Sequence, residues 1–215
     1  GETYVFPSID IYSRAEKKSS MIIVDPKLEL VKSSYETLQK RGYEIHILNL
    51  TDPRDSMGFN PLQLVIDAYK RKEYAEAELL CSSFCFSIFN PDAGDGDSQF
   101  WSNNSTALLT ALILAHVEDC LEADRKANEA GKKKFLEKQQ AFQEMSQEEQ
   151  AQIRQNWIPA MEKEYALPEQ VFVPSQDNEK KINMYSIINT FSVLANQKVD
   201  ENLTKLDLYF NDRDD

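Results

Sequence analysis

Asn60-Pro61 divides this sequence into two parts with different apolar patterns. Beyond it, apolar residues recur at helical spacing almost to the end of the chain, first in residues 62–70 and 74–89. Residues 100–121 are apolar and contain neither Gly nor Pro, which predicts a central buried helix. The larger part of the chain is therefore expected to fold as packed helices.

The part before Asn60 predicts a strand, a helix and a second strand. Residues 20–24 form a short, β-branched apolar run, which is typical of a buried strand in a covered sheet. Residues 28–41 carry a helical stripe, and Gly42 follows at the position of a helix C-cap. Residues 43–50 predict the second strand. We therefore expect a βαβ unit here, and a fold that is mainly α with a small α/β portion.

Charge and composition limit the classes of function. The net charge is −12, and residues 63–215 hold 16 Lys or Arg against 27 Asp or Glu. Without a basic stripe, simple coating of nucleic acid is disfavoured, and the acidic surface suits basic protein partners or solubility. An odd number of cysteines, with no signal peptide and no membrane-length apolar run, predicts a soluble chain in a reducing compartment.

Four soft side chains are spaced as a zinc site would require. Cys81 and Cys85 are one helical turn apart, and so are His116 and Cys120. Cysteine is among the most buried residue types, and all four positions fall on apolar helices. We interpret them as core residues and predict no metal.

The turn-rich loop of residues 92–97 offers a possible partner contact. It differs from a calcium loop because Asn103 replaces the bidentate Glu at the twelfth position. Asp95, Asp97 and Trp101 are the residues that would contact a partner, although an aromatic beside a long apolar helix is more often part of the core.

The best site candidate is the segment Asp25-Pro26-Lys27-Leu28-Glu29, directly after the first predicted strand, where open α/β sheets place their ligands. Alternatively, its two acids cap and charge the first turn of the next helix. A third interpretation combines Asp10, Asp25 and Lys27 in a metal-dependent nuclease. The proline argues against that interpretation, because it disrupts strand geometry.

No phosphate-binding loop of the Gly-x-x-x-x-Gly-Lys-Ser/Thr type occurs in the chain. Seven motifs occur in a characteristic order: IIVDPKLEL (residues 22–30), RGYEIHILNL (41–50), NPL (60–62), FW (100–101), ALL (107–109), FSV (191–193) and LDLYF (206–210). In order and spacing they resemble the TraG/TraD family of type IV secretion coupling proteins. The match extends over most of the chain except about residues 122–180, and Leu28 stands where the family usually has glycine.

This resemblance implies a fold and a domain organisation. Residues 1–62 would be part of a P-loop NTPase motor sheet without its phosphate loop, and residues 63–208 would form an all-helical domain. Residues 209–215 would begin the return to the motor domain. Residues 122–150, rich in Lys, Glu and Gln, are expected to form a solvated helical hairpin or a partly mobile segment.

The resemblance also implies a function. The parent protein would be a membrane-associated, hexameric ATPase that uses ATP and Mg²⁺ to deliver DNA and its relaxase to the secretion channel. This chain would supply the substrate-recognition domain on the cytoplasmic face, monomeric by itself, with no catalytic residue and no bound cofactor. The alternative function, from a different class of protein, is that of a stand-alone helical protein-interaction adaptor.

Overall fold

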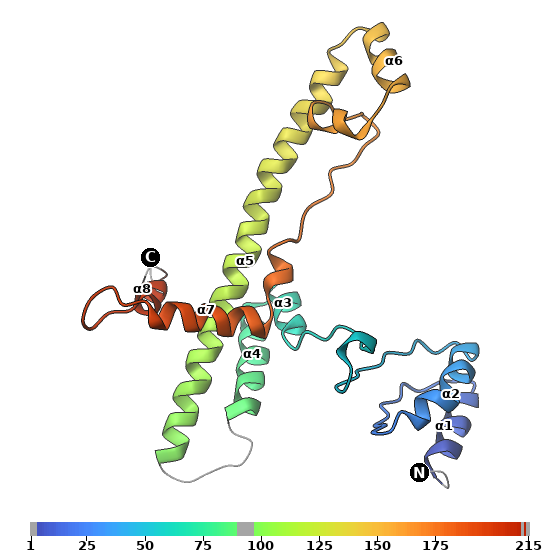
Figure 1. The fold of residues 1–215 in the computed structure, drawn as a ribbon, viewed down its shortest axis with the longest axis vertical. Helices are drawn as coiled ribbons and strands as arrows, with labels where there is room; N and C mark the ends of the chain where they lie inside the picture. The colour runs from blue at the N-terminus through green and yellow to red at the C-terminus, as the bar shows by residue number, and fades with distance from the viewer. Residues whose placement is uncertain (1–3, 90–96, 212, 214–215) are drawn as a thin grey trace. The chain divides into compact units, whose positions relative to one another are not determined.

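The structure is a computed structural model that describes residues 4–89, 97–211 and 213. The chain divides into two compact units, Gly1–Phe59 and Asn60–Asp215, and Figure 1 shows the helices of each. We describe the two units separately.

The described part of the first unit contains two helices and one short 3-10 turn. They are α1 (Val5–Arg14), α2 (Glu29–Lys40) and η1 (Pro53–Asp55). The guanidinium of Arg41, just after α2, donates to the carboxylate of Asp10 in α1 at 2.9 Å. This ion pair fastens the two helices together in a unit with few buried side chains.

The expected βαβ sheet is wrong, because no strand forms in the described part of this unit. Residues 20–24 and 43–50 have no regular secondary structure. A buried strand needs a neighbouring strand for its backbone groups and cover on its faces. Neither is present, since Ile22, Val24 and Leu50 are 100%, 83% and 86% exposed. Both segments have the sequence pattern of a strand, but neither has a partner strand in the described part of the unit.

The second unit is built around α5 (Asp97–Gln143), and the mainly α prediction is confirmed there. Helix α5 contacts α3, α4, α7 and η3, and α8 packs against α7. An isolated antiparallel bridge between Lys198 and Thr204 is the only β pairing among the described residues. The other elements of this core are α3 (Gln63–Lys70), α4 (Tyr74–Phe89), η3 (Glu179–Lys181), α7 (Met184–Asn196) and α8 (Lys205–Asn211).

Only part of the predicted central helix is buried. Leu112, Ile113 and Val117 are at most 5% exposed, and they recur on one face of α5 at helical spacing. The beginning of the same helix is different, because Phe100 and Trp101 are 61% and 68% exposed. Helix α5 therefore enters the core only after its first few turns.

Beyond the core, α5 continues into a region that we call the extension (residues 122–178). The extension consists of the second half of α5, α6 (Gln147–Gln155), η2 (Pro159–Lys163) and the segment that returns to η3 (Figure 1). Ser146 and Glu149 form a capping box that starts α6. Phe142 is fully buried, which gives the end of the extension a small core of its own.

The returning segment is fastened to one face of α5. Asn128 and Ser175 exchange two hydrogen bonds of 2.8 Å. The side-chain amide of Gln139 donates to two other backbone carbonyls of the segment, those of Leu167 and Gln170. Between them, the ring of Phe172 lies so close to Gly131 that a Cβ atom there would be 3.2 Å from it. These contacts recur every three to eight residues along α5, so the segment follows the helix.

Asp124 joins the beginning of the extension, in α5, to the end of the returning segment. Its carboxylate accepts hydrogen bonds from the backbone N–H groups of Asn178 and Glu179, at 3.0 and 2.8 Å, and from the Asn178 amide at 2.8 Å. Burial opposes ionisation of this carboxyl. The donated hydrogen bonds outweigh burial and lower the pKa of Asp124 below its ordinary value.

We expect Asp124→Asn to release the returning segment from α5, at a cost of about 2 kcal/mol, because the substitution replaces a charged acceptor of three hydrogen bonds. Hydrogen exchange of the backbone amides of residues 175–181 measures the loss. Since the folded pKa is lowered, the charge stabilises the fold above the unfolded pKa, and this stabilisation disappears as the pH falls through the folded pKa. The difference between the two proteins should therefore shrink below about pH 4. A difference that does not change with pH would contradict the assignment.

Candidate functional site

The Asp25–Glu29 segment forms a turn that leads into α2. The Asp25 carboxylate accepts a hydrogen bond of 2.9 Å from the N–H of Val31, in the first turn of the helix. Its carbonyl accepts another, of 3.2 Å, from the N–H of Leu28. This geometry is that of a helix cap, the second of the interpretations given above for this segment.

Leu28 adopts a left-handed backbone conformation, with φ of 58° and ψ of 18°. Non-glycine residues rarely adopt this conformation, because the Cβ atom approaches the following carbonyl. The resemblance expects glycine at this position, and the structure supplies the physical reason. The turn between Asp25 and α2 needs a positive φ, and leucine holds it under strain.

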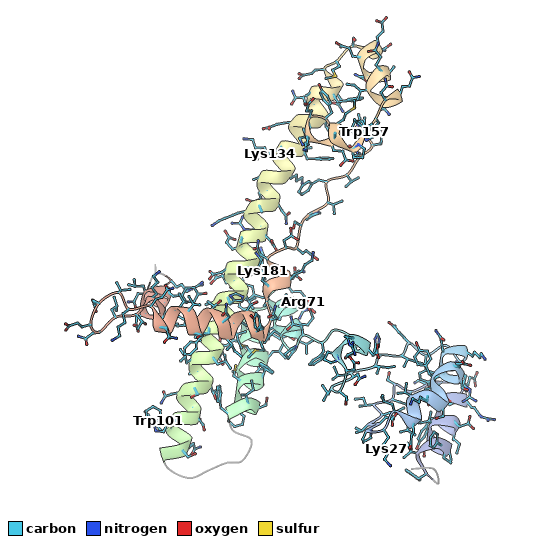
Figure 2. The ribbon with its side chains drawn as sticks, in the orientation of Figure 1. Lys27, Arg71, Trp101, Lys134, Trp157 and Lys181 are labelled. Carbon is cyan, nitrogen blue, oxygen red and sulfur yellow. The ribbon has the colours of Figure 1, made fainter. Side chains whose placement is uncertain are left out.

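A cleft of about 620 Å³ lies beside this turn. Asp25 and Leu28 line it, together with the apolar face of α2 and parts of the two extended segments. Pro26, Lys27 and Glu29 are exposed, and Figure 2 labels Lys27. The sequence pattern did not predict this cleft. Two segments that line it were predicted as paired strands, and in the structure they do not pair.

The nuclease interpretation finds no support in the geometry. Asp10 lies in α1, where Arg14 and Arg41 donate to its carboxylate and lower its pKa. The described residues contain no group of three or more His, Cys, Asp or Glu that could hold a metal ion. The carboxylates of Asp10 and Asp25 therefore have separate contacts rather than a common centre.

The cysteines lie in the helical core. Cys81, Cys85 and Cys120 are free and buried. The thiol of Cys81 lies 3.8 Å from the carbonyl oxygen of Thr110, and that of Cys120 lies 3.7 Å from the His116 ring. Burial raises the pKa of the Cys120 thiol. These contacts are those of packed side chains.

The resemblance motif at residues 60–62 starts the helical unit. The Asn60 amide donates a hydrogen bond of 2.7 Å to the carbonyl of Ile182, and its oxygen accepts one from the N–H of Leu62. Leu62 is fully buried. Asn60 thus joins the first turn before α3 to the segment before α7, which gives a structural role to a residue that both the change of apolar pattern and the resemblance had singled out.

Exposed aromatic side chains occur in the last turns of α4 and in the first turn of α5, and Figure 1 shows these two helix ends on the same side of the core. Phe86 and Phe89 of α4 are 54% and 36% exposed, and Phe100 and Trp101 of α5 are more exposed still. We call these four residues the aromatic end. Trp101 is thus not the core residue that its position beside an apolar helix suggested.

The aromatic end has no cation near it in the sequence. No Lys, Arg or Glu occurs between Glu78 and Glu118, and the charged residues of this interval are Asp92, Asp95 and Asp97. This signal in the sequence could have indicated a helical surface without cations. Asp95 lies outside the described residues, and so does the side chain of Asp97. Trp101 is therefore the one predicted contact residue whose side chain the structure describes.

Comparison with known proteins gives one match. The family described as Type IV secretory system conjugative DNA transfer matches residues 14–212, which is most of the chain. No curated protein and no solved structure matches it. Among the described helices, none is both long and apolar enough to cross a membrane.

We expect Leu28→Gly to stabilise α2 by up to about 1 kcal/mol, because glycine adopts a positive φ without steric cost. Leu28→Val should destabilise α2 by about 1–2 kcal/mol, because a β-branched side chain tolerates this conformation least. Hydrogen exchange of the α2 amides measures both changes. If the glycine variant exchanged faster than the valine variant, partial burial of Leu28 in the cleft would outweigh its backbone strain.

Proposed function

Because the chain belongs to the family of type IV secretory system conjugative DNA transfer proteins, we propose that its helical unit recognises a protein delivered with the DNA, such as the relaxase. The observation that carries this proposal is the aromatic end. Exposed aromatic side chains on rigid helices are favoured anchors of protein interfaces, because they bury a large area at a small cost in conformational entropy.

The charge distribution supports a protein partner at this surface. The helical unit has a net charge of −11, from 16 Lys or Arg and 27 Asp or Glu, and no cation lies near the aromatic end in the sequence. Binding to DNA needs cations that neutralise phosphates. A partner with an apolar patch surrounded by basic residues would match both the aromatic side chains and the acidic surface.

ATP and Mg²⁺, the cofactors that the resemblance implies, do not fit the residues of this chain. The sequence has no phosphate-binding loop, and the described part offers no cluster of metal ligands. In our proposal, ATP hydrolysis, hexamer formation, DNA movement and attachment to the channel belong to the complete transfer motor on the cytoplasmic side of the membrane. This chain contributes the recognition surface.

We expect Phe100→Ala with Trp101→Ala to weaken binding of the cognate relaxase at least about tenfold, because the double change removes both anchors of α5. A titration with fluorescently labelled relaxase measures the affinity. Tyr185→Ala is a matched control, because it removes an aromatic side chain that is 82% exposed on α7. The fold is checked by circular dichroism.

A second readout locates the contact. The chain has two tryptophans, so Trp157→Phe leaves Trp101 as the only indole. Its emission should shift to shorter wavelength when the relaxase covers it. Unchanged emission, or equal affinity for the double variant and the Tyr185 control, would exclude the aromatic end as the recognition surface.

A further inference from the structure

Helix α8 is held to the helical unit with little burial. None of its seven residues is fully buried, and Leu206, Tyr209 and Phe210 are half-buried where they pack against the core. The beginning of the helix is stabilised locally. The carboxylate of Asp207 accepts a hydrogen bond of 2.7 Å from the N–H of Thr204, and the Thr204 hydroxyl accepts one from the N–H of Asp207 in return. This cap starts α8 without a contact from the core.

The segment after α8 reaches back to α5 through one arginine. The guanidinium of Arg213 donates a hydrogen bond of 2.9 Å to the carboxylate of Glu118 and a second one to the carboxylate of Asp119. The Asp119 carboxylate also accepts a hydrogen bond of 2.6 Å from the hydroxyl of Tyr209 in α8. The guanidinium lies over the Tyr209 ring, 4.6 Å from its centre. We call these four residues the latch, because they join the end of α8 to α5.

The latch is a contact that solvent can weaken. The side chains of Glu118 and Asp119 are 56% and 47% exposed, and that of Arg213 is 24% exposed. Exposed ion pairs contribute little to stability and are screened by salt. In addition, the Nε group of Arg213 is buried and has no hydrogen-bond partner in the described part of the chain. An unsatisfied buried donor favours an open form, in which water reaches it.

The closed position of α8 covers apolar surface of the core. Leu206 and Phe210 pack against the same apolar cluster as Tyr69 of α3. Burial and the neighbouring Glu118 carboxylate raise the pKa of Tyr69 to about 12. Glu118 therefore lies beside both α3 and Arg213. Movement of α8 away from α5 would expose apolar side chains at this place.

We propose that α8 is a flap, which the latch closes, and that the flap opens while the rest of the helical core stays folded. The reason is a difference in burial. Opening α8 separates three half-buried side chains and a partly exposed ion-pair network, whereas unfolding the core exposes Leu112, Ile113 and Val117, which are almost fully buried. Segments with few buried contacts open at a lower cost in free energy than the core. The closed flap hides the apolar surface beneath it, and the open flap makes that surface accessible.

Native-state hydrogen exchange of the complete chain measures the opening. The amides of residues 208–211 report on α8, and those of residues 113–117 report on the buried part of α5. We expect the α8 amides to be at least about tenfold less protected than the α5 amides at about 0.05 M salt. Raising the salt to about 0.5 M should accelerate exchange in α8 and leave α5 unchanged, because salt screens the latch.

Two substitutions test the latch. Arg213→Gln removes the guanidinium charge, and Asp119→Asn removes one of its two carboxylates while keeping an acceptor for the Tyr209 hydroxyl. Each should raise the exchange rate of the α8 amides about tenfold and reduce its dependence on salt. The double variant should exchange about as fast as Arg213→Gln alone, because the second change removes a partner that is already lost.

Arg154→Gln is the matched control. Arg154 also donates two hydrogen bonds to one carboxylate, that of Glu169, but it lies in the extension. The control loses the same charge as Arg213→Gln. It therefore separates the latch from a general effect of net charge.

Faster exchange in α8 alone, with a weaker dependence on salt in the latch variants, would support the proposal. Equal protection of α8 and the buried part of α5 in the unsubstituted chain would overturn it, because α8 would then open only with the whole core. Unchanged exchange in Arg213→Gln, or equally fast exchange in Arg154→Gln, would also overturn it. None of these substitutions changes the aromatic end, so relaxase binding reports separately on the proposed function.

Discussion

Burial of one face of α5 determines the structure of the helical unit. Leu112, Ile113 and Val117 lie in a single apolar cluster with buried residues of α3, α4 and α7. The surrounding helices contribute one short apolar face each, and α5 is the element that most of them contact. Because packing rather than helix propensity supplies most of the stability of such helices, loss of this face would affect every element of the core. The end of α4 and the extension are positioned through α5, and α8 is positioned through its packing against α7.

The sequence predicted α2 and the helices of the core because helical periodicity is a local property, but it did not predict α1 (Val5–Arg14). The stripe in residues 28–41 corresponds to α2, and Gly42, predicted as its C-cap, has a positive φ of 85°. The strands failed because pairing is not local. Residues 20–24 and 43–50 have the β-branched composition of buried strands, but composition cannot say whether an adjacent strand exists. The length of α5 was also underestimated, since a polar helix held by a returning segment has little apolar periodicity.

The candidate sites were predictable to different degrees. Capping of α2 by Asp25 followed from residue type and position, and it was one of the interpretations that the sequence allowed. The left-handed conformation of Leu28 could not be derived from leucine itself, and only the family glycine indicated it. The exposure of Trp101 depends on where α4 ends, which is a tertiary property. Net charge was a poor guide to the extension, because the net charge of +4 in residues 125–138 cancels the net charge of −4 in residues 144–169.

The continuity of α5 has a consequence for how this chain can vary in length. Each residue of an α-helix turns the following part by about 100° and advances it by about 1.5 Å. One residue inserted between the core and Asp124 would rotate the later half of α5 relative to the core, and Asp124 would no longer face the backbone N–H of Glu179 at the beginning of η3. Insertions and deletions in α5 should therefore be tolerated mainly in steps close to whole turns. Connections such as the one between α5 and α6 are under no such restriction.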